Sequence, residues 1–266
     1  MIKGLLRQEV LPAEHIIASG PRPERGDHLS ETYDVGVTTD NKQAVKQAGV
    51  VVLAVKPQVL EAVMGELRGT VPHGALVLSI VAGATLEKIE SGLGHKGVVR
   101  SMPNTPAQVG EGITVWTASK SVSDVQFDQA GTILRALGEQ VYVEDEDFLD
   151  MATALSGTGP AYVFLFMEAM VDAGVHLGFP RYIAEKLVLQ TVKGSVEYVL
   201  QTQRHLARLR NQVTSPGGTS AEALYFLERA GFRTALSRAI WAAYQRSVAL
   251  GKGQKKGRLA DGDGGT

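Results

Sequence analysis

Cysteine is absent from the 266 residues of this chain. Disulfide bonds, thiolate catalysis and zinc sites with cysteine ligands are therefore excluded. The six histidines show no metal-ligand spacing, so we expect no metal site. Neither sign of charge is in excess, with 27 Lys and Arg against 28 Asp and Glu. This balance indicates neither nucleic acid nor a membrane surface as a partner.

The sequence has no secretory leader and no long hydrophobic run. No basic segment followed by an apolar core opens the chain, and this predicts a cytoplasmic location. The longest apolar run, residues 161–171, is interrupted by Glu168. It is shorter than the roughly 20 residues that a membrane-spanning helix needs, so we expect no membrane span.

Apolar runs alternate with helical patterns over residues 1–145, which predicts a doubly wound α/β domain with a parallel sheet. Strands are expected at residues 15–19, 35–38, 50–55, 75–81, 98–101, 113–117 and 140–143. The run at 50–55 is continuously apolar, which is typical of a strand buried on both faces. Ligands of such folds bind beyond the carboxyl ends of the strands.

Only helical patterns follow after Asp150. We expect an α/β domain over residues 1–145, a helical domain over residues 146–252 and a disordered tail over residues 253–266. Residues 161–171 are apolar on nearly every side, which predicts complete burial, inside the domain or between subunits. We favour a dimer, and a monomeric bundle is the alternative.

A glycine turn separates two helical patterns at residues 212–220. Pro216 cannot continue a helix, and Gly217 and Gly218 permit positive φ and close approach of a ligand. Thr219 and Glu222 form a Thr-x-x-Glu pattern, which predicts that Thr219 caps the next helix. Free amides at such a helix start suit a small anion, such as a carboxylate. An ordinary helix–helix turn is the alternative interpretation.

Four motifs together resemble those of the pyrroline-5-carboxylate reductases. They are Ala-Val-Lys-Pro at 54–57, Arg-Ser-Met-Pro-Asn-Thr-Pro at 100–106, Leu-Ser-Gly-Thr-Gly-Pro-Ala-Tyr at 155–162 and Val-Thr-Ser-Pro-Gly-Gly-Thr at 213–219. They follow the family's order, and the resemblance covers residues 1 to about 250. It implies reduction of the C=N bond of 1-pyrroline-5-carboxylate to L-proline. It also implies an N-terminal Rossmann domain and a C-terminal helical domain that forms homodimers or larger homo-oligomers.

The same resemblance implies NADPH as the cofactor, with NADH as the alternative, because an arginine at position 22 pairs well with a 2′-phosphate. The implied cofactor positions are Ser19, Gly20, Arg22, Asn41, Ala54, Val55, Lys56, Pro57, Ile80, Val81, Ala82 and Gln212. The implied substrate positions are Glu146, Gly217, Gly218, Thr219 and Ser220. Ser220 is the candidate catalytic donor to the imine nitrogen, unless the substrate binds already protonated.

One departure from the family is large, because the sequence lacks the first strand and the Gly-x-Gly motif that follows it. That strand would lie between those expected at 15–19 and 50–55, so a gap of about 10 Å should separate them. We expect that the recorded start is misplaced. We also expect the chain as written to bind NADPH weakly or not at all and to fold poorly in its first half.

Two other functions are alternatives to the reductase. One is a truncated, non-catalytic subunit of the same fold. The other is an oxidoreductase like the β-hydroxyacid dehydrogenases, which carry a lysine and an asparagine after the interdomain glycine motif. Residues 157–175 contain neither, which argues against that second function.

Overall fold

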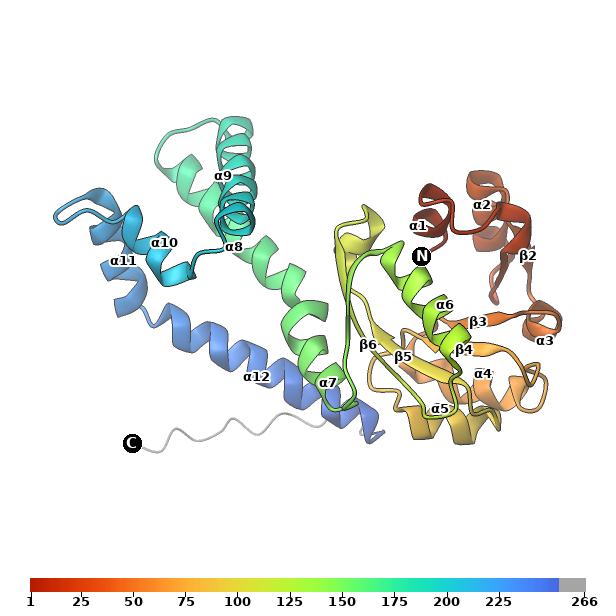
Figure 1. Ribbon diagram of the computed structural model, residues 1–266. Helices are drawn as coiled ribbons and strands as arrows, with labels where there is room; N and C mark the ends of the chain where they lie inside the picture. The colour runs from red at the N-terminus through yellow and green to blue at the C-terminus, as the bar shows by residue number, and fades with distance from the viewer. Residues whose placement is uncertain (254–266) are drawn as a thin grey trace. The chain divides into compact units, whose positions relative to one another are not determined.

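The computed structural model describes residues 1–253, which fold into two compact units (Figure 1). Unit 1 comprises Met1–Thr158 together with the chain from Ala242 onward, and unit 2 comprises Gly159–Trp241. The last helix therefore begins in unit 2 and ends in unit 1. The tail expected over residues 253–266 lies, apart from Gly253, outside the described residues.

Unit 1 is built on a five-stranded sheet with the strand order β3-β4-β5-β6-β7. The strands are β3 (Val50–Leu53), β4 (Leu76–Ser79), β5 (Val98–Met102), β6 (Gly112–Ala118) and β7 (Gly138–Tyr142). All neighbours are parallel except β5 and β6, which are antiparallel. Only the short helix η3 (Thr105–Gln108) lies between these two strands, and a parallel pair needs a longer crossover. The sheet is therefore mixed rather than wholly parallel.

A second, two-stranded sheet stands apart in the same unit. It pairs β1 (Ile17–Ser19) with β2 (Gly36–Thr38) in parallel, through α2 (Pro23–Tyr33). Within residues 1–253 no ladder joins β1 to β3, as the absence of the strand between them predicted. The predicted burial of residues 50–55 on both faces is wrong, because Val52 is 36% exposed. The reason is that β3 lies at the edge of its sheet.

Helices cover both faces of the five-stranded sheet (Figure 1). The first face carries α4 (Leu60–Leu67) and α5 (Leu86–Leu93), which pack Leu60, Met64 and Ile89 against β4 and β5. The other carries α1 (Ile2–Arg7) and α6 (Asp124–Arg135), whose Leu5 and Leu134 pack near the buried Trp116. Burying each of these side chains contributes about 2 kcal/mol. The short helix α3 (Asn41–Val45) begins after Asp40, whose side chain caps it.

Unit 2 contains helices only. They are α8 (Gly159–His176), α9 (Arg181–Thr202), α10 (Leu206–Gln212), α11 (Thr219–Arg229) and the first part of α12 (Phe232–Gly251). Their buried core is small and consists of Val171, Ala184 and Val188. The predicted burial of residues 161–171 is wrong for the single chain, because Leu165 is 66% exposed. Since α8 packs on α9 along one face only, its other apolar face stays uncovered by the described residues.

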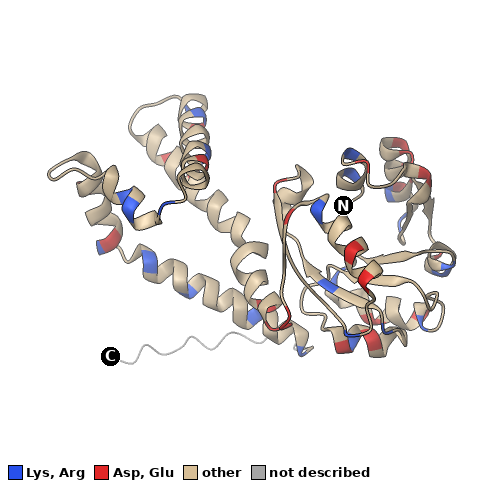
Figure 2. Ribbon diagram, in the orientation of Figure 1, with Lys and Arg blue, Asp and Glu red and all other residues tan. Residues whose placement is uncertain are grey.

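The helical segment Phe148–His176 runs through α7 (Phe148–Ala152), a π-helical turn and α8. By length and composition alone it is long and apolar enough to cross a membrane, which the run 161–171 alone is not. Glu168 and Asp172 are the two residues among Asp, Glu, Lys and Arg in its α8 part, so most of that ribbon is tan in Figure 2.

Candidate functional site

A pocket of about 210 Å³ lies at the carboxyl end of β1. The predicted Ser19, Gly20 and Arg22 line it, together with Arg25 and Thr38. Arg22 precedes α2 as its N-cap residue, and Pro23 begins the helix, where the missing amide proton of proline costs nothing. The pocket therefore places two guanidinium groups and the first turn of a helix together, an arrangement that suits a phosphate.

Asn41 belongs to the same region through its hydrogen bonds. The hydroxyl of Ser19 donates to Asn41 Oδ1 at 2.8 Å, and Asn41 Nδ2 donates to Glu66 Oε2 at 2.9 Å. Asp40 holds the start of α3 by accepting from the amides of Lys42 and Gln43. The structure thus brings together the four predicted positions 19, 20, 22 and 41.

The other predicted cofactor residues of unit 1 follow β3 and β4. Ala54, Val55, Lys56 and Pro57 come directly after β3, and Ile80, Val81 and Ala82 come directly after β4. Because β3 and β4 are parallel neighbours, these segments lie at the same edge of the sheet, where α/β folds bind ligands. The amide of Ile80 donates to the Leu53 carbonyl at 3.1 Å, which ties the two segments together. The Val81 side chain is buried in the core, so only its backbone can face a ligand.

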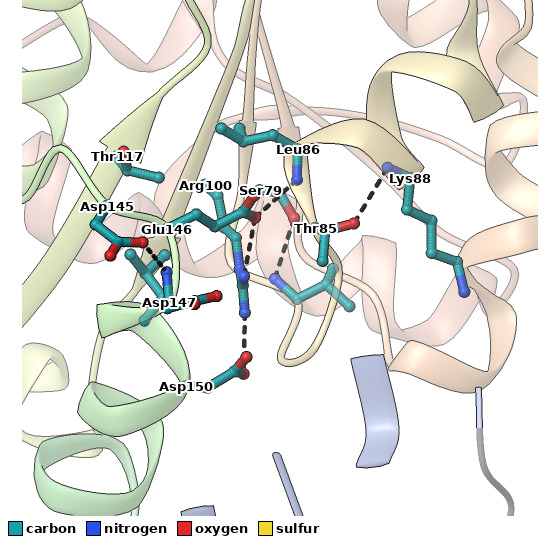
Figure 3. Close-up of polar contacts among 12 residues, drawn as sticks. Ser79, Thr85, Leu86, Lys88, Arg100, Thr117, Asp145, Glu146, Asp147 and Asp150 are labelled. Atoms are coloured by element: carbon teal, nitrogen blue, oxygen red, sulfur yellow. Dashed lines mark hydrogen bonds and ion pairs between the residues drawn. The ribbon is translucent and has the colours of Figure 1, made fainter. Parts of the chain in front are cut away.

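Glu146 lies in a cluster of charged groups that the sequence did not predict (Figure 3). Arg100 of β5 forms ion pairs with Glu146 at 2.9 Å and with Asp150 at 3.2 Å. Ser247 of α12 donates to the same Asp150 oxygen at 2.6 Å. The only sequence signal was an arginine inside an apolar strand, because the partners of Arg100 lie far from it along the chain.

In unit 2, the helix after the glycine turn begins one residue earlier than predicted. The helix α11 has Gly218, not Thr219, as its N-cap, with no side-chain cap, so the predicted capping box does not form. Gly217 adopts a φ of +71°, which glycine tolerates best. A Cβ at position 218 would lie 2.5 Å from the Ser215 hydroxyl. Glycine has no Cβ and avoids this contact, and Gly218 takes the extended conformation of an N-cap residue.

The start of α11 still presents free donors. Among the described residues, neither the Thr219 amide nor the Ser220 amide donates a backbone hydrogen bond. The hydroxyl of Thr214 is engaged with the Arg210 carbonyl at 2.7 Å. Gln212, the last residue of α10, is exposed next to this turn. Two amides at the positive end of a helix suit a carboxylate.

The predicted site residues thus fall into both units. Gln212 and the four residues from Gly217 to Ser220 belong to unit 2, and all the others belong to unit 1. Within residues 1–253, no cluster of three or more His, Cys, Asp or Glu residues could hold a metal ion.

Two protein-family models match the chain. The model described as pyrroline-5-carboxylate reductase dimerisation matches residues 146–250, and the model described as NADP oxidoreductase coenzyme F420-dependent matches residues 1–83. The pyrroline-5-carboxylate reductase of Synechocystis is 45% identical over 93% of this chain and 92% of its own length. The Escherichia coli enzyme of that name is 36% identical over 92% of this chain and 90% of its own length.

Solved structures agree with these matches. A Plasmodium falciparum pyrroline carboxylate reductase with NADP bound superposes with a TM-score of 0.86, at 32% identity over 93% of this chain and 92% of that one. The Coxiella burnetii pyrroline-5-carboxylate reductase gives a TM-score of 0.84, at 38% identity over 94% of this chain and 93% of that one. The mixed sheet with helices on both faces, followed by a helical domain, is shared with these structures. The chain belongs to the pyrroline-5-carboxylate reductase family.

Proposed function

We propose that the chain reduces the C=N bond of 1-pyrroline-5-carboxylate to give L-proline. The single observation that carries this proposal is the 45% identity to a pyrroline-5-carboxylate reductase over 93% of the chain. NADPH, when bound, supplies the hydride, and the protein binds and orients the two reactants. The division into a dinucleotide-binding domain over residues 1–145 and a helical domain over residues 146–252 is part of the proposal.

The pocket at β1 supports NADPH as the preferred cofactor. Arg22 and Arg25 line this pocket, and Asp27 is the one acidic residue among its lining residues. Guanidinium groups pair with a phosphate more strongly than with a ribose hydroxyl, so the pocket fits a 2′-phosphate. NADH is the poorer alternative.

The predicted substrate residues have separate tasks in this proposal. The amides of Thr219 and Ser220 bind the substrate carboxylate at the start of α11. The Ser220 hydroxyl donates a hydrogen bond or a proton to the imine nitrogen, which makes the imine carbon more electrophilic. Proton transfer from a positioned side chain typically contributes about 10²-fold or more. If the substrate binds already protonated, its nitrogen has no lone pair left for the Ser220 hydroxyl, and Glu146 instead accepts a hydrogen bond from the N–H.

The uncovered face of unit 2 supports a homodimer or a larger homo-oligomer. The dimerisation model of the family covers residues 146–250, which include the whole of α8. A second copy that covers Leu165 and its apolar neighbours would supply the burial that the single chain lacks. We infer that this contact, rather than a membrane, explains the apolar segment. The absence of a nucleic-acid partner and the cytoplasmic location stay predictions.

An NADPH-oxidation assay with 1-pyrroline-5-carboxylate tests the proposal, together with a fluorescence titration of NADPH. Turnover that depends on both reactants supports the reductase. An oligomer that neither binds NADPH nor turns over is the non-catalytic subunit. Oxidation of a β-hydroxyacid with NADP⁺, without imine reduction, would show the other oxidoreductase class.

A further inference from the structure

Arg100 is almost completely buried between two carboxylates. Its side chain is 3% exposed, in a strand whose preceding residues are the buried Val98 and Val99. Burying a guanidinium is costly unless it is paired with good geometry. The planar fork meets this need, because Nη1 reaches Glu146 Oε1 at 2.9 Å while Nη2 reaches Asp150 Oδ1 at 3.2 Å. Arg100 therefore fixes the two carboxylates relative to β5.

One oxygen of Glu146 is fully occupied by the protein. Besides Arg100, Oε1 accepts from the amide of Leu86 at 2.8 Å (Figure 3). Leu86 is the first residue of α5, so this amide lies at the positive end of the helix. The side chain of Glu146 is 26% exposed, and Oε2 has no hydrogen-bond partner among residues 1–253. The two donors thus hold the carboxylate in one orientation and leave Oε2 open.

The cluster also has an excess of negative charge. One guanidinium faces two carboxylates, and the remaining partner, Ser247, is neutral. An uncompensated, partly buried negative charge attracts a cation beside Glu146. A protonated cyclic imine is such a cation, and so is the cyclic secondary amine that its reduction produces.

We propose that Arg100 is a positioning residue for the imine reduction. Together with the Leu86 amide it holds Glu146, so that Oε2 accepts a hydrogen bond from the N–H of the protonated cyclic imine. This inference rests on the proposed function, which supplies the substrate. It adds a role for Arg100 and for the start of α5 that concerns substrate binding and not cofactor binding.

The amide of Leu86 can be removed with little damage to the helix. Proline is tolerated at the first helical position, and Thr85 before it has the extended conformation that a following proline requires. Leu86→Pro therefore removes one hydrogen bond to Glu146 and the leucine side chain. Leu86→Ala removes the side chain alone and is the matched control. We expect Leu86→Pro to raise the KM for 1-pyrroline-5-carboxylate about tenfold over Leu86→Ala, with the KM for NADPH unchanged within about twofold.

Arg100→Lys and Glu146→Gln provide a second test. An ammonium keeps the charge but cannot copy the bidentate fork, so Arg100→Lys should also raise the substrate KM about tenfold. If both residues act through one contact, the double variant should be no worse than the poorer single variant. Arg68→Lys, in which the exposed arginine donates only to backbone carbonyls, is the control and should leave both KM values unchanged.

The outcomes separate the two proposals. A wild-type chain without imine reduction refutes the proposed function, and the positioning role falls with it. An active wild type whose Leu86→Pro and Leu86→Ala variants share one substrate KM refutes the positioning role alone. Equal increases in both KM values, or independent effects in the double variant, also refute it.

Discussion

The hydroxyl of Ser247 donates a 2.6 Å hydrogen bond to Asp150 Oδ1, which joins residues 97 positions apart in the chain. Ser247 is the one buried residue of α12, and Asp150 belongs to α7. The last residue of α12 also packs closely against Gly83, because a Cβ at Gly83 would lie 2.8 Å from the backbone nitrogen of Gly251. The end of α12 is therefore an integral part of unit 1.

Replacing Ser247 by alanine should destabilise unit 1. The change leaves the Asp150 carboxylate without one of its two donors, and losing a buried hydrogen bond to a charged group costs about 1.5–3 kcal/mol. Urea unfolding followed by a probe in unit 1, such as the buried Trp116, measures the change. Ser91→Ala is the control, because the exposed Ser91 hydroxyl only donates to a carbonyl of its own helix. Equal stability of the two variants would contradict the prediction.

Arg22→Ala should weaken NADPH binding more than NADH binding. The two cofactors differ only in the 2′-phosphate, and a lost guanidinium–phosphate pair costs about 1.5–3 kcal/mol. The ratio of the two dissociation constants should therefore shift about tenfold or more toward NADH. Fluorescence titration of both cofactors measures it, with the exposed Arg204→Ala as control. An equal loss for both cofactors would place the 2′-phosphate away from Arg22.

Gly218→Ala should raise the KM for the pyrroline substrate. The new Cβ would lie 2.5 Å from the Ser215 hydroxyl and 3.2 Å from its carbonyl, so the turn must shift and carry the Thr219 and Ser220 amides with it. We expect an increase of about tenfold, the value of one lost hydrogen bond to a carboxylate. Gly65→Ala in α4 is the control, because nothing lies within 4 Å of its Cβ position. If Gly218→Ala leaves the KM unchanged, this turn does not bind the carboxylate.

The strands of unit 1 lie close to where the sequence predicts them, because buried apolar runs and their Pro or Gly endings are local signals. Three other features were not predictable from such signals. The antiparallel direction of β6 follows from the short connection between β5 and β6. The exposure of Val52 follows from the position of β3 at the edge of its sheet. The cap of α11 moves by one residue because glycine itself can take the extended cap conformation.

The residues of the candidate site also fall into those that local motifs indicate and those that only long-range contacts bring together. Residues beside strand ends, such as Ser19 and Lys56, can be proposed from sequence motifs, and their roles stay predictions. The cluster at Glu146 could not be proposed, because its ion pairs and hydrogen bonds join residues 46 to 97 positions apart. Such contacts depend on the packing of β5, α7 and α12, which no local pattern encodes.

The two-stranded sheet should exchange its amide protons faster than the five-stranded sheet. The side chain of Ile17 in β1 is 56% exposed, whereas Leu76, Val77 and Leu78 in β4 are completely buried. Isolated two-stranded pairs are marginally stable, so β1 and β2 should open locally. Hydrogen exchange measured by mass spectrometry should show protection on the order of 100-fold lower there than in β4. Equal protection would mean that β1 gains stability from a contact outside its own ladder.

Placing a charge on the uncovered face of α8 should break the oligomer. Leu165 is among the most exposed apolar residues of this helix, and the family's dimerisation model includes it. Leu165→Glu would bury an unpaired carboxylate in the contact, at a cost of several kcal/mol, so the chain should become monomeric. Sedimentation velocity measures this, and Val125→Glu on the exposed face of α6 is the matched control. A Leu165→Glu variant that keeps the wild-type mass would show that the subunits meet through a different face.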